Sequence, residues 1–147
     1  MDAKSTLIGG LLSAACAFAQ AASVEAPSAR ELHSAQCVAA LQVSTESLAQ
    51  EVKAGKDAAR PVLQGRVEAG TAFVGDAYLH GTTDEGRARA LASNALEAQK
   101  SLNPSELTAR QEACAAEGAT LLSNSNSLER SIVKRMAKKR MEKLLGG

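Results

Sequence analysis

Residues 103–122, NPSELTARQEACAAEGATLL, predict an amphipathic helix with a clear beginning and a cysteine on its apolar face. Asn103 can cap the helix with its side chain, Pro104 fits the first helical turn, and Glu106 supplies an acid at the third position. The apolar residues that recur every seven positions are Leu107, Cys114 and Leu121. Because seven residues make about two helical turns, these side chains share a face, which we expect to pack on another helix.

Three upstream segments also show helical periodicity between start and stop signals, so the sequence predicts an all-α fold. They run from about Ser28 to Ala54, from about Asp57 to His80, and from Thr82 to about Leu102. Thr82 and Glu85 have the spacing of a capping box for the third segment. The apolar stripe expected on the second comprises Leu63, Val67, Gly70, Val74 and Ala77. Short turns between the four helices favour an up-down-up-down four-helix bundle over residues 22–122.

The composition agrees with this fold class and disfavours two kinds of function. Alanine and the long, unbranched residues that favour helices are common, and β-branched residues are sparse. Aromatic residues make up only 2% of the chain, whereas proteins that stack sugars or single-stranded bases use more aromatic surface. We therefore expect neither sugar stacking nor binding of single-stranded nucleic acid.

Residues 1–21 are interpreted as a secretory signal peptide, which indicates a periplasmic or secreted protein. Lys4 supplies the positive region, residues 7–15 are mostly apolar, and alanines with the spacing of a cleavage site follow at positions 17, 19 and 21. This apolar run is far shorter than the roughly 20 residues of a membrane-spanning helix. The alternative is a lipoprotein lipidated at Cys16. It is disfavoured because Ser13 stands where such signals usually carry a large aliphatic residue.

Removal of Cys16 with the signal peptide leaves Cys37 and Cys114, which we expect to form a disulfide in an oxidising compartment. Cys37 lies about 13 Å along the first helix at 1.5 Å per residue. Cys114 lies at a matching distance from the end of the fourth helix, so the two meet if these helices are antiparallel. A bond between residues 77 positions apart stabilises a fold by about 4 kcal/mol in the chain-entropy model. The alternative is two unpaired buried thiols.

The C-terminal part of the chain is strongly basic. Residues 123–127, SNSNS, form a polar break, and residues 128–147 are predicted to be a basic amphipathic helix or an extension of the fourth helix. Seven basic and two acidic residues give residues 128–145 a net charge of +5, whereas residues 20–127 carry nine basic and thirteen acidic residues. The near-neutral total therefore conceals a separation of charge between body and tail.

Three interpretations of this basic segment remain open. It can be a fifth helix that packs on the body, an interfacial helix on an anionic membrane surface, or a binding site for an unknown acidic protein or other polyanion. Nucleic acid is not an expected partner of an exported chain. The candidate contact residues for a partner or membrane are Arg130, Lys134, Arg135, Lys138, Lys139 and Arg140.

Motifs of catalysis and cofactor binding do not occur in the sequence. There is no Gly-x-Ser-x-Gly, His-Glu-x-x-His, Cys-x-x-Cys or phosphate-binding glycine loop, so we expect neither an enzyme nor a bound cofactor. The alternative is a periplasmic metal or haem carrier, for which His33, His80 and Asp76 form a conceivable ligand set. A disulfide would make Cys37 unavailable as a further ligand.

Taken together, the export signal, the cysteine of the first helix, the segment from Leu102 to Cys114 and the basic ending resemble small proteobacterial periplasmic helical proteins of uncharacterised function. Acid-stress periplasmic chaperones are similar in class, since they are small, helical and held by one disulfide. The resemblance implies a non-enzymatic accessory protein with a binding, stress-response or envelope-associated role. It brings no catalytic residues to assign.

Overall fold

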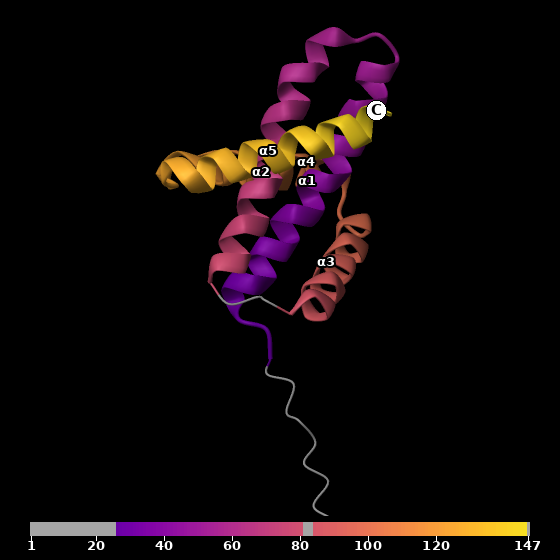
Figure 1. Cartoon of the computed structure of the whole chain (residues 1–147). Coiled ribbons are helices and arrows are strands. Elements are labelled where there is room, and N and C mark those ends of the chain that lie inside the picture. The colour runs from indigo at the N-terminus through magenta and orange to yellow at the C-terminus, as the bar shows by residue number, and fades with distance from the viewer. Residues whose placement is uncertain (1–25, 81–83, 147) are drawn as a thin grey trace, which may run out of the picture.

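The computed structural model describes residues 26–80 and 84–146, and within these ranges all regular secondary structure is helical. The elements are α1 (Ala29–Lys53), the short 3-10 turn η1 (Asp57–Ala59), α2 (Arg60–Leu79), α3 (Glu85–Lys100), α4 (Pro104–Asn124) and α5 (Ser127–Leu145), as Figure 1 shows. The all-α prediction is therefore confirmed. The expected signal peptide and Cys16 lie outside the described residues. No described helix is both long and apolar enough to cross a membrane.

Side-chain caps set the beginnings of four helices. Ser28, Asn103 and Asn126 each accept a hydrogen bond from the backbone N–H three residues later, and a glutamate at that position accepts one from the cap's own N–H. These reciprocal bonds satisfy donors that a helix start leaves without partners. Asp84 caps α3 by accepting from the N–H of Arg87. The described helix thus begins later than the expected start at Thr82, which lies outside the described residues.

The polar SNSNS run separates α4 from α5. Ser125 is extended after the end of α4, and Asn126 caps the next helix, so residues 105–145 form two helices. The Arg130 guanidinium donates to the carbonyl oxygens of Ser123 and Ser125 at 3.3 and 2.8 Å. Because these carbonyls end α4, Arg130 ties the start of α5 to the end of α4.

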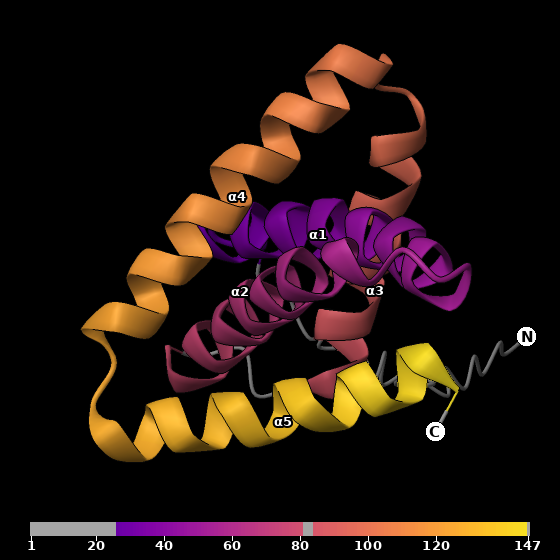
Figure 2. The same cartoon turned by 90° about the horizontal axis from the view of Figure 1, so that it is seen from above.

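α1 and α2 form an antiparallel pair, and the other helices pack around it (Figure 1). α3 packs on α1, while α4 contacts both α2 and α1. Figure 2 shows α4 and α5 as the two arms of a V with the α1–α2 pair between them. The expected up-down-up-down bundle is not confirmed, because α3 packs mainly on α1 instead of filling the place between α2 and α4.

A glycine at the contact of α4 with α2 explains how closely these two helices approach. A Cβ atom built on Gly118 would lie 2.6 Å from the Ala69 Cβ and 2.8 Å from both the Ala69 Cα and its carbonyl oxygen. These distances are well below ordinary van der Waals contact. The two backbones therefore touch at a point where neither residue has a large side chain, and α4 crosses α2 there.

The buried side chains form two clusters, which lie toward opposite ends of the α1–α2 pair. The first joins α1, α2 and α4 and comprises Cys37, Leu41, Ala69, Phe73 and Cys114. The second joins α1, α2 and α5 and comprises Ala49, Val52, Leu63, Val67 and Ala137. Since α2 contributes to both, its buried face is wider than a single stripe. Phe73 is buried while Val74, which the sequence placed in the stripe, is 46% exposed.

Candidate functional site

Cys37 of α1 and Cys114 of α4 are joined by a disulfide, as the sequence predicts. Their Cα atoms are 5.2 Å apart, and the two residues are only 1% and 4% exposed. The bond lies within the first buried cluster and links the beginning of α1 to the middle of α4. It therefore fixes α4 to the α1–α2 pair.

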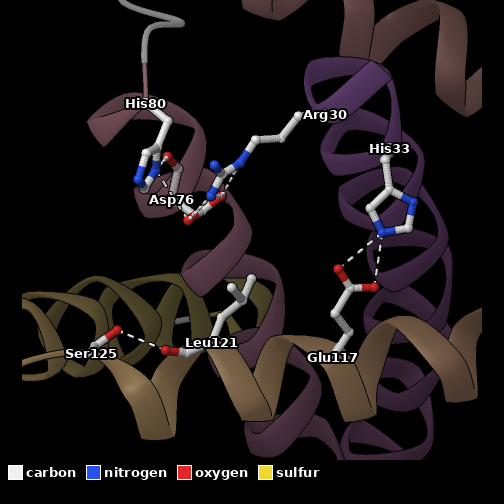
Figure 3. Close-up of polar contacts among 7 residues, drawn as sticks. All are labelled: Arg30, His33, Asp76, His80, Glu117, Leu121 and Ser125. Carbon is white, nitrogen blue, oxygen red and sulfur yellow. Dashed lines mark hydrogen bonds and ion pairs between the residues drawn. The ribbon is translucent and has the colours of Figure 1, made fainter. Parts of the chain in front are cut away.

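A histidine and a glutamate flank this disulfide at the surface. His33 stands one turn before Cys37 on α1, and Glu117 stands one turn after Cys114 on α4. Figure 3 shows the two side chains pointing toward each other across the helices, with the His33 Nε2 2.8 and 3.0 Å from the Glu117 carboxylate oxygens. The same Nε2 lies 3.9 Å from the Cys37 sulfur. We call His33, Cys37, Cys114 and Glu117 the cysteine cluster.

The cysteine cluster opens into a surface pocket between α1 and α4. The pocket has a volume of about 460 Å³, and all four residues of the cluster line it together with Arg110. The Phe73 ring meets the His33 ring edge-on, with 6.2 Å between centroids. The imidazole is thus held on one side by an aromatic ring of the core and on the other by a carboxylate.

The metal-ligand set considered from the sequence does not come together. The Asp76 carboxylate accepts hydrogen bonds from the Nε and from one terminal nitrogen of Arg30, at 2.8 to 3.2 Å, and lies 3.2 Å from the His80 Nδ1 (Figure 3). His33 faces Glu117 instead. Among the described residues, the group with ligand atoms all within 4.8 Å of one another is His33, Cys37 and Glu117. Glu117 was missed in the sequence, although its place three residues after Cys114 puts both on one helix face.

α5 packs on the α1–α2 pair and leaves part of its apolar surface exposed. Val133 and Ala137 are buried, and Met141, Leu144 and Leu145 pack against the second cluster. Leu128, Ile132 and Met136, which stand four residues apart on a neighbouring stripe, are 69, 50 and 48% exposed. The tail is therefore a fifth helix that packs on the body through one face, while a second apolar stripe on the same helix stays exposed.

The exposed stripe of α5 lies beside exposed apolar side chains of α2, and we call these residues together the α2–α5 patch. The patch comprises Val74, Tyr78, Leu79, Leu128, Ile132 and Met136. All of these except Leu128 line a groove of about 630 Å³ between the two helices, which Leu121, Asn124 and Ser125 at the end of α4 also line. The patch holds six of the eight large hydrophobic side chains exposed among the described residues, so they are concentrated in one place.

The predicted contact cations all lie on α5, but they differ in their surroundings. Arg130 is engaged by carbonyl oxygens at the end of α4. In residues 26–80 and 84–146, no salt bridge involves Lys134, Arg135, Lys138, Lys139 or Arg140. Arg135 and Lys139 each follow a patch residue by three positions, so they border the exposed stripe. Arg140 follows Met136 by four positions and lines a pocket with Met136 and Val74. The exposed Lys143, seven positions after Met136, lies on the same side as the stripe, whereas Lys134 and Lys138 lie on other sides of the helix.

No protein-family model, curated protein or solved structure matches this chain. The candidates for function are therefore its two unusual surfaces, the α2–α5 patch with its cations and the cysteine cluster with its pocket. The patch belongs to α2 and α5 and the cysteine cluster to α1 and α4, so the two surfaces share no residue.

Proposed function

We propose that this protein is an exported, non-enzymatic accessory protein that docks on an anionic membrane surface through the α2–α5 patch and the cations of α5. One observation carries the proposal: exposed apolar side chains of α2 and α5 are concentrated beside α5, which has a net charge of +5 and makes no salt bridge within the part of the chain that the structure describes. Contiguous apolar surface of this kind marks interaction sites in folded proteins. A positively charged border selects an anionic partner.

Export is the second part of the proposal. The Cys37–Cys114 disulfide supports it, because such bonds persist in oxidising compartments and are rare in the cytosol. The signal-like sequence of residues 1–21 supports it independently. A periplasmic or secreted location would bring the patch to an envelope or cell surface. Mass spectrometry of the protein isolated from the periplasm or medium should show a chain that begins close to residue 22.

The expected strength of docking is that of a reversible, peripheral contact. Each cation near an anionic surface contributes about 1 kcal/mol, and each half-exposed Leu, Ile or Met that enters the interface adds about 1 kcal/mol. Arg135, Lys139 and Lys143 with the three exposed apolar residues of α5 give roughly 6 kcal/mol, before the cost of orienting the protein is subtracted. Binding should therefore depend strongly on salt and on the fraction of anionic lipid.

Vesicle flotation tests this proposal. The oxidised protein should float with vesicles of phosphatidylcholine and phosphatidylglycerol at low salt and remain unbound to phosphatidylcholine alone. Ile132→Ser/Met136→Ser should lose most of the binding, whereas the matched control Leu32→Ser/Val62→Ser should retain it. Leu32 and Val62 are similarly exposed, at 42 and 48%, but lie outside the patch.

The charge requirement has its own matched pair of variants. Arg135→Gln/Lys139→Gln removes two cations beside the patch, and Arg60→Gln/Arg89→Gln removes two exposed cations elsewhere. Only the first should weaken flotation. If the unmodified protein stays unbound to anionic vesicles at low salt, or if both pairs act alike, docking on a membrane through α5 is ruled out. An acidic protein or other polyanion would then be the remaining class of partner.

A further inference from the structure

The cysteine cluster contains the donor set of a metal centre. Imidazole nitrogen, thiolate sulfur and carboxylate oxygen are the three ligand types that bind Zn²⁺ in proteins, usually four at a time in a tetrahedron. His33 and Cys37 come from one turn of α1, and Cys114 and Glu117 come from one turn of α4. In the oxidised protein the two sulfurs are bonded to each other, which leaves only His33 and Glu117 as free donors.

We propose that reduction of the Cys37–Cys114 disulfide converts this cluster into a Zn²⁺ site with His33, Cys37, Cys114 and Glu117 as its four ligands. The protein then has two interchangeable crosslinks between α1 and α4, a disulfide when oxidised and a metal ion when reduced. This inference concerns a different surface from the α2–α5 patch and does not depend on docking to a membrane.

In the oxidised protein the ligand atoms of three of the four proposed residues, His33, Cys37 and Glu117, already lie within 4.8 Å of one another. Tetrahedral Zn²⁺ with ordinary bond lengths separates a nitrogen from a sulfur ligand by about 3.6 Å and a nitrogen from an oxygen ligand by about 3.4 Å. The His33 Nε2 is already 3.9 Å from the Cys37 sulfur and 2.8 Å from the nearer Glu117 oxygen. Shifts of less than 1 Å would satisfy both pairs. Once separated, the two sulfurs need about 3.8 Å between them, which side chains on Cα atoms 5.2 Å apart can span.

The surroundings of the cluster also suit an ion. The pocket of about 460 Å³ reaches all four residues, so an ion can enter without a rearrangement of the helices. Phe73 supports the His33 ring from the core. Two thiolates, one carboxylate and Zn²⁺ leave a net charge of −1, and Arg110 on the wall of the same pocket carries the opposite charge.

The chemistry balances with one dithiol reductant. The reductant gives two electrons and two protons to the Cys37–Cys114 bond and becomes a disulfide itself, while the protein gains two thiols. Zn²⁺ then displaces the two thiol protons and forms two metal–sulfur bonds, with His33 and Glu117 completing the site. A disulfide oxidant reverses the sequence: it takes two electrons from the two thiolates and two protons from solvent and becomes a dithiol, while the Cys37 and Cys114 sulfurs join and the ion is released. Metal affinity is therefore controlled by the redox state of one cysteine pair.

A spectroscopic titration tests the proposal. The full chain carries Cys16→Ser in every variant, which removes the third cysteine as a competing ligand. It is reduced with dithiothreitol, desalted without oxygen and titrated with Co²⁺, a coloured substitute for Zn²⁺. We expect one Co²⁺ per reduced chain, with thiolate-to-cobalt charge-transfer bands that Zn²⁺ abolishes, and no such bands for the oxidised chain.

Variants of the proposed ligands distinguish a metal site with four specific ligands from metal binding by the cysteine thiols alone. His33→Ala and Glu117→Gln should each weaken Co²⁺ binding by more than about tenfold, while the matched controls His80→Ala and Glu97→Gln should leave it unchanged. Circular dichroism of the reduced chain, with and without Zn²⁺, reports whether the helices persist and whether the ion restores any that are lost. The proposal is overturned if reduced protein binds no stoichiometric metal, or if binding needs the cysteines but is indifferent to both His33 and Glu117.

Discussion

Replacement of Gly118 by alanine tests the close approach of α4 to α2 on which the whole arrangement depends. The new Cβ would lie 2.6 Å from the Ala69 Cβ and 2.8 Å from two backbone atoms of Ala69. Backbone atoms cannot move away by a rotamer change as a flexible side chain can, so the two helices must separate by about 1 Å. That separation removes up to half of the van der Waals energy of each neighbouring contact. Overpacking of this kind costs about 2–3 kcal/mol. Alanine favours the helix over glycine by about 1 kcal/mol, which offsets part of this loss of stability.

The net expectation for Gly118→Ala is a loss of about 1–2 kcal/mol, or a fall of roughly 4–8 °C in the melting temperature of a chain this size. Gly65 is the matched control, because it lies within α2 with no atom within 4 Å of a Cβ built on it. Gly65→Ala should stabilise the protein by about 0.5–1 kcal/mol.

Urea unfolding of the two oxidised variants, followed by circular dichroism, measures both free energies against the unmodified protein. Opposite signs for the two glycines are the decisive result. If Gly118→Ala is as stable as Gly65→Ala, the backbones of α4 and α2 do not touch at Gly118, and the crossing of the two helices described above is wrong.

Three further changes have expected effects on stability. Cys37→Ala/Cys114→Ala should lower the free energy of unfolding in urea by about 4 kcal/mol, and a loss below 1 kcal/mol would contradict the crosslink as a main restraint. Asn126→Ala should cost about 1 kcal/mol and fray the start of α5, measurable by amide hydrogen exchange. Asp76→Asn should cost at most about 1 kcal/mol, falling with added salt, since its partner Arg30 is half-exposed.

Local signals in the sequence account for the helix ends and for the disulfide. The Asn103–Glu106 spacing predicted a helix start that the reciprocal hydrogen bonds of the capping box confirm. Cys37 and Cys114 lie on apolar faces that do meet, so their pairing was also accessible. The helix start depends only on residue spacing within one helix. The disulfide depends on the apolar faces of two helices and on the oxidising compartment that the signal-like sequence indicates.

The sequence could not predict how the helices cross. Its stripe on α2 included Val74 and left out Phe73, because a periodic stripe assumes one packing partner, whereas α2 is contacted by α1, α4 and α5. The packing of α3 on α1 likewise depends on how the side chains of the two helices fit together along their entire contact faces. Glu117 was missed for the same reason, since its meeting with His33 exists only once α4 lies across α1.

The two proposed surfaces should respond separately to reduction of the disulfide. The patch is positioned by α5, and α5 is held mainly by the second cluster, whose buried residues belong to α1, α2 and α5 with none from α4. The disulfide belongs to the first cluster, toward the other end of the pair. Breaking it therefore loosens α4 before it disturbs the contacts that hold Val133 and Ala137.

This separation predicts that reduced protein with Zn²⁺ floats with anionic vesicles as well as oxidised protein does, while its metal content changes from none to one ion per chain. Flotation and metal analysis of the same samples measure both. Arg130 is the one described hydrogen-bonding link between the end of α4 and α5, so Arg130→Ala is the informative variant. If reduction abolishes flotation of the unmodified protein but spares that of Arg130→Ala, α4 controls the patch through this link, and the two surfaces form one redox-sensitive device.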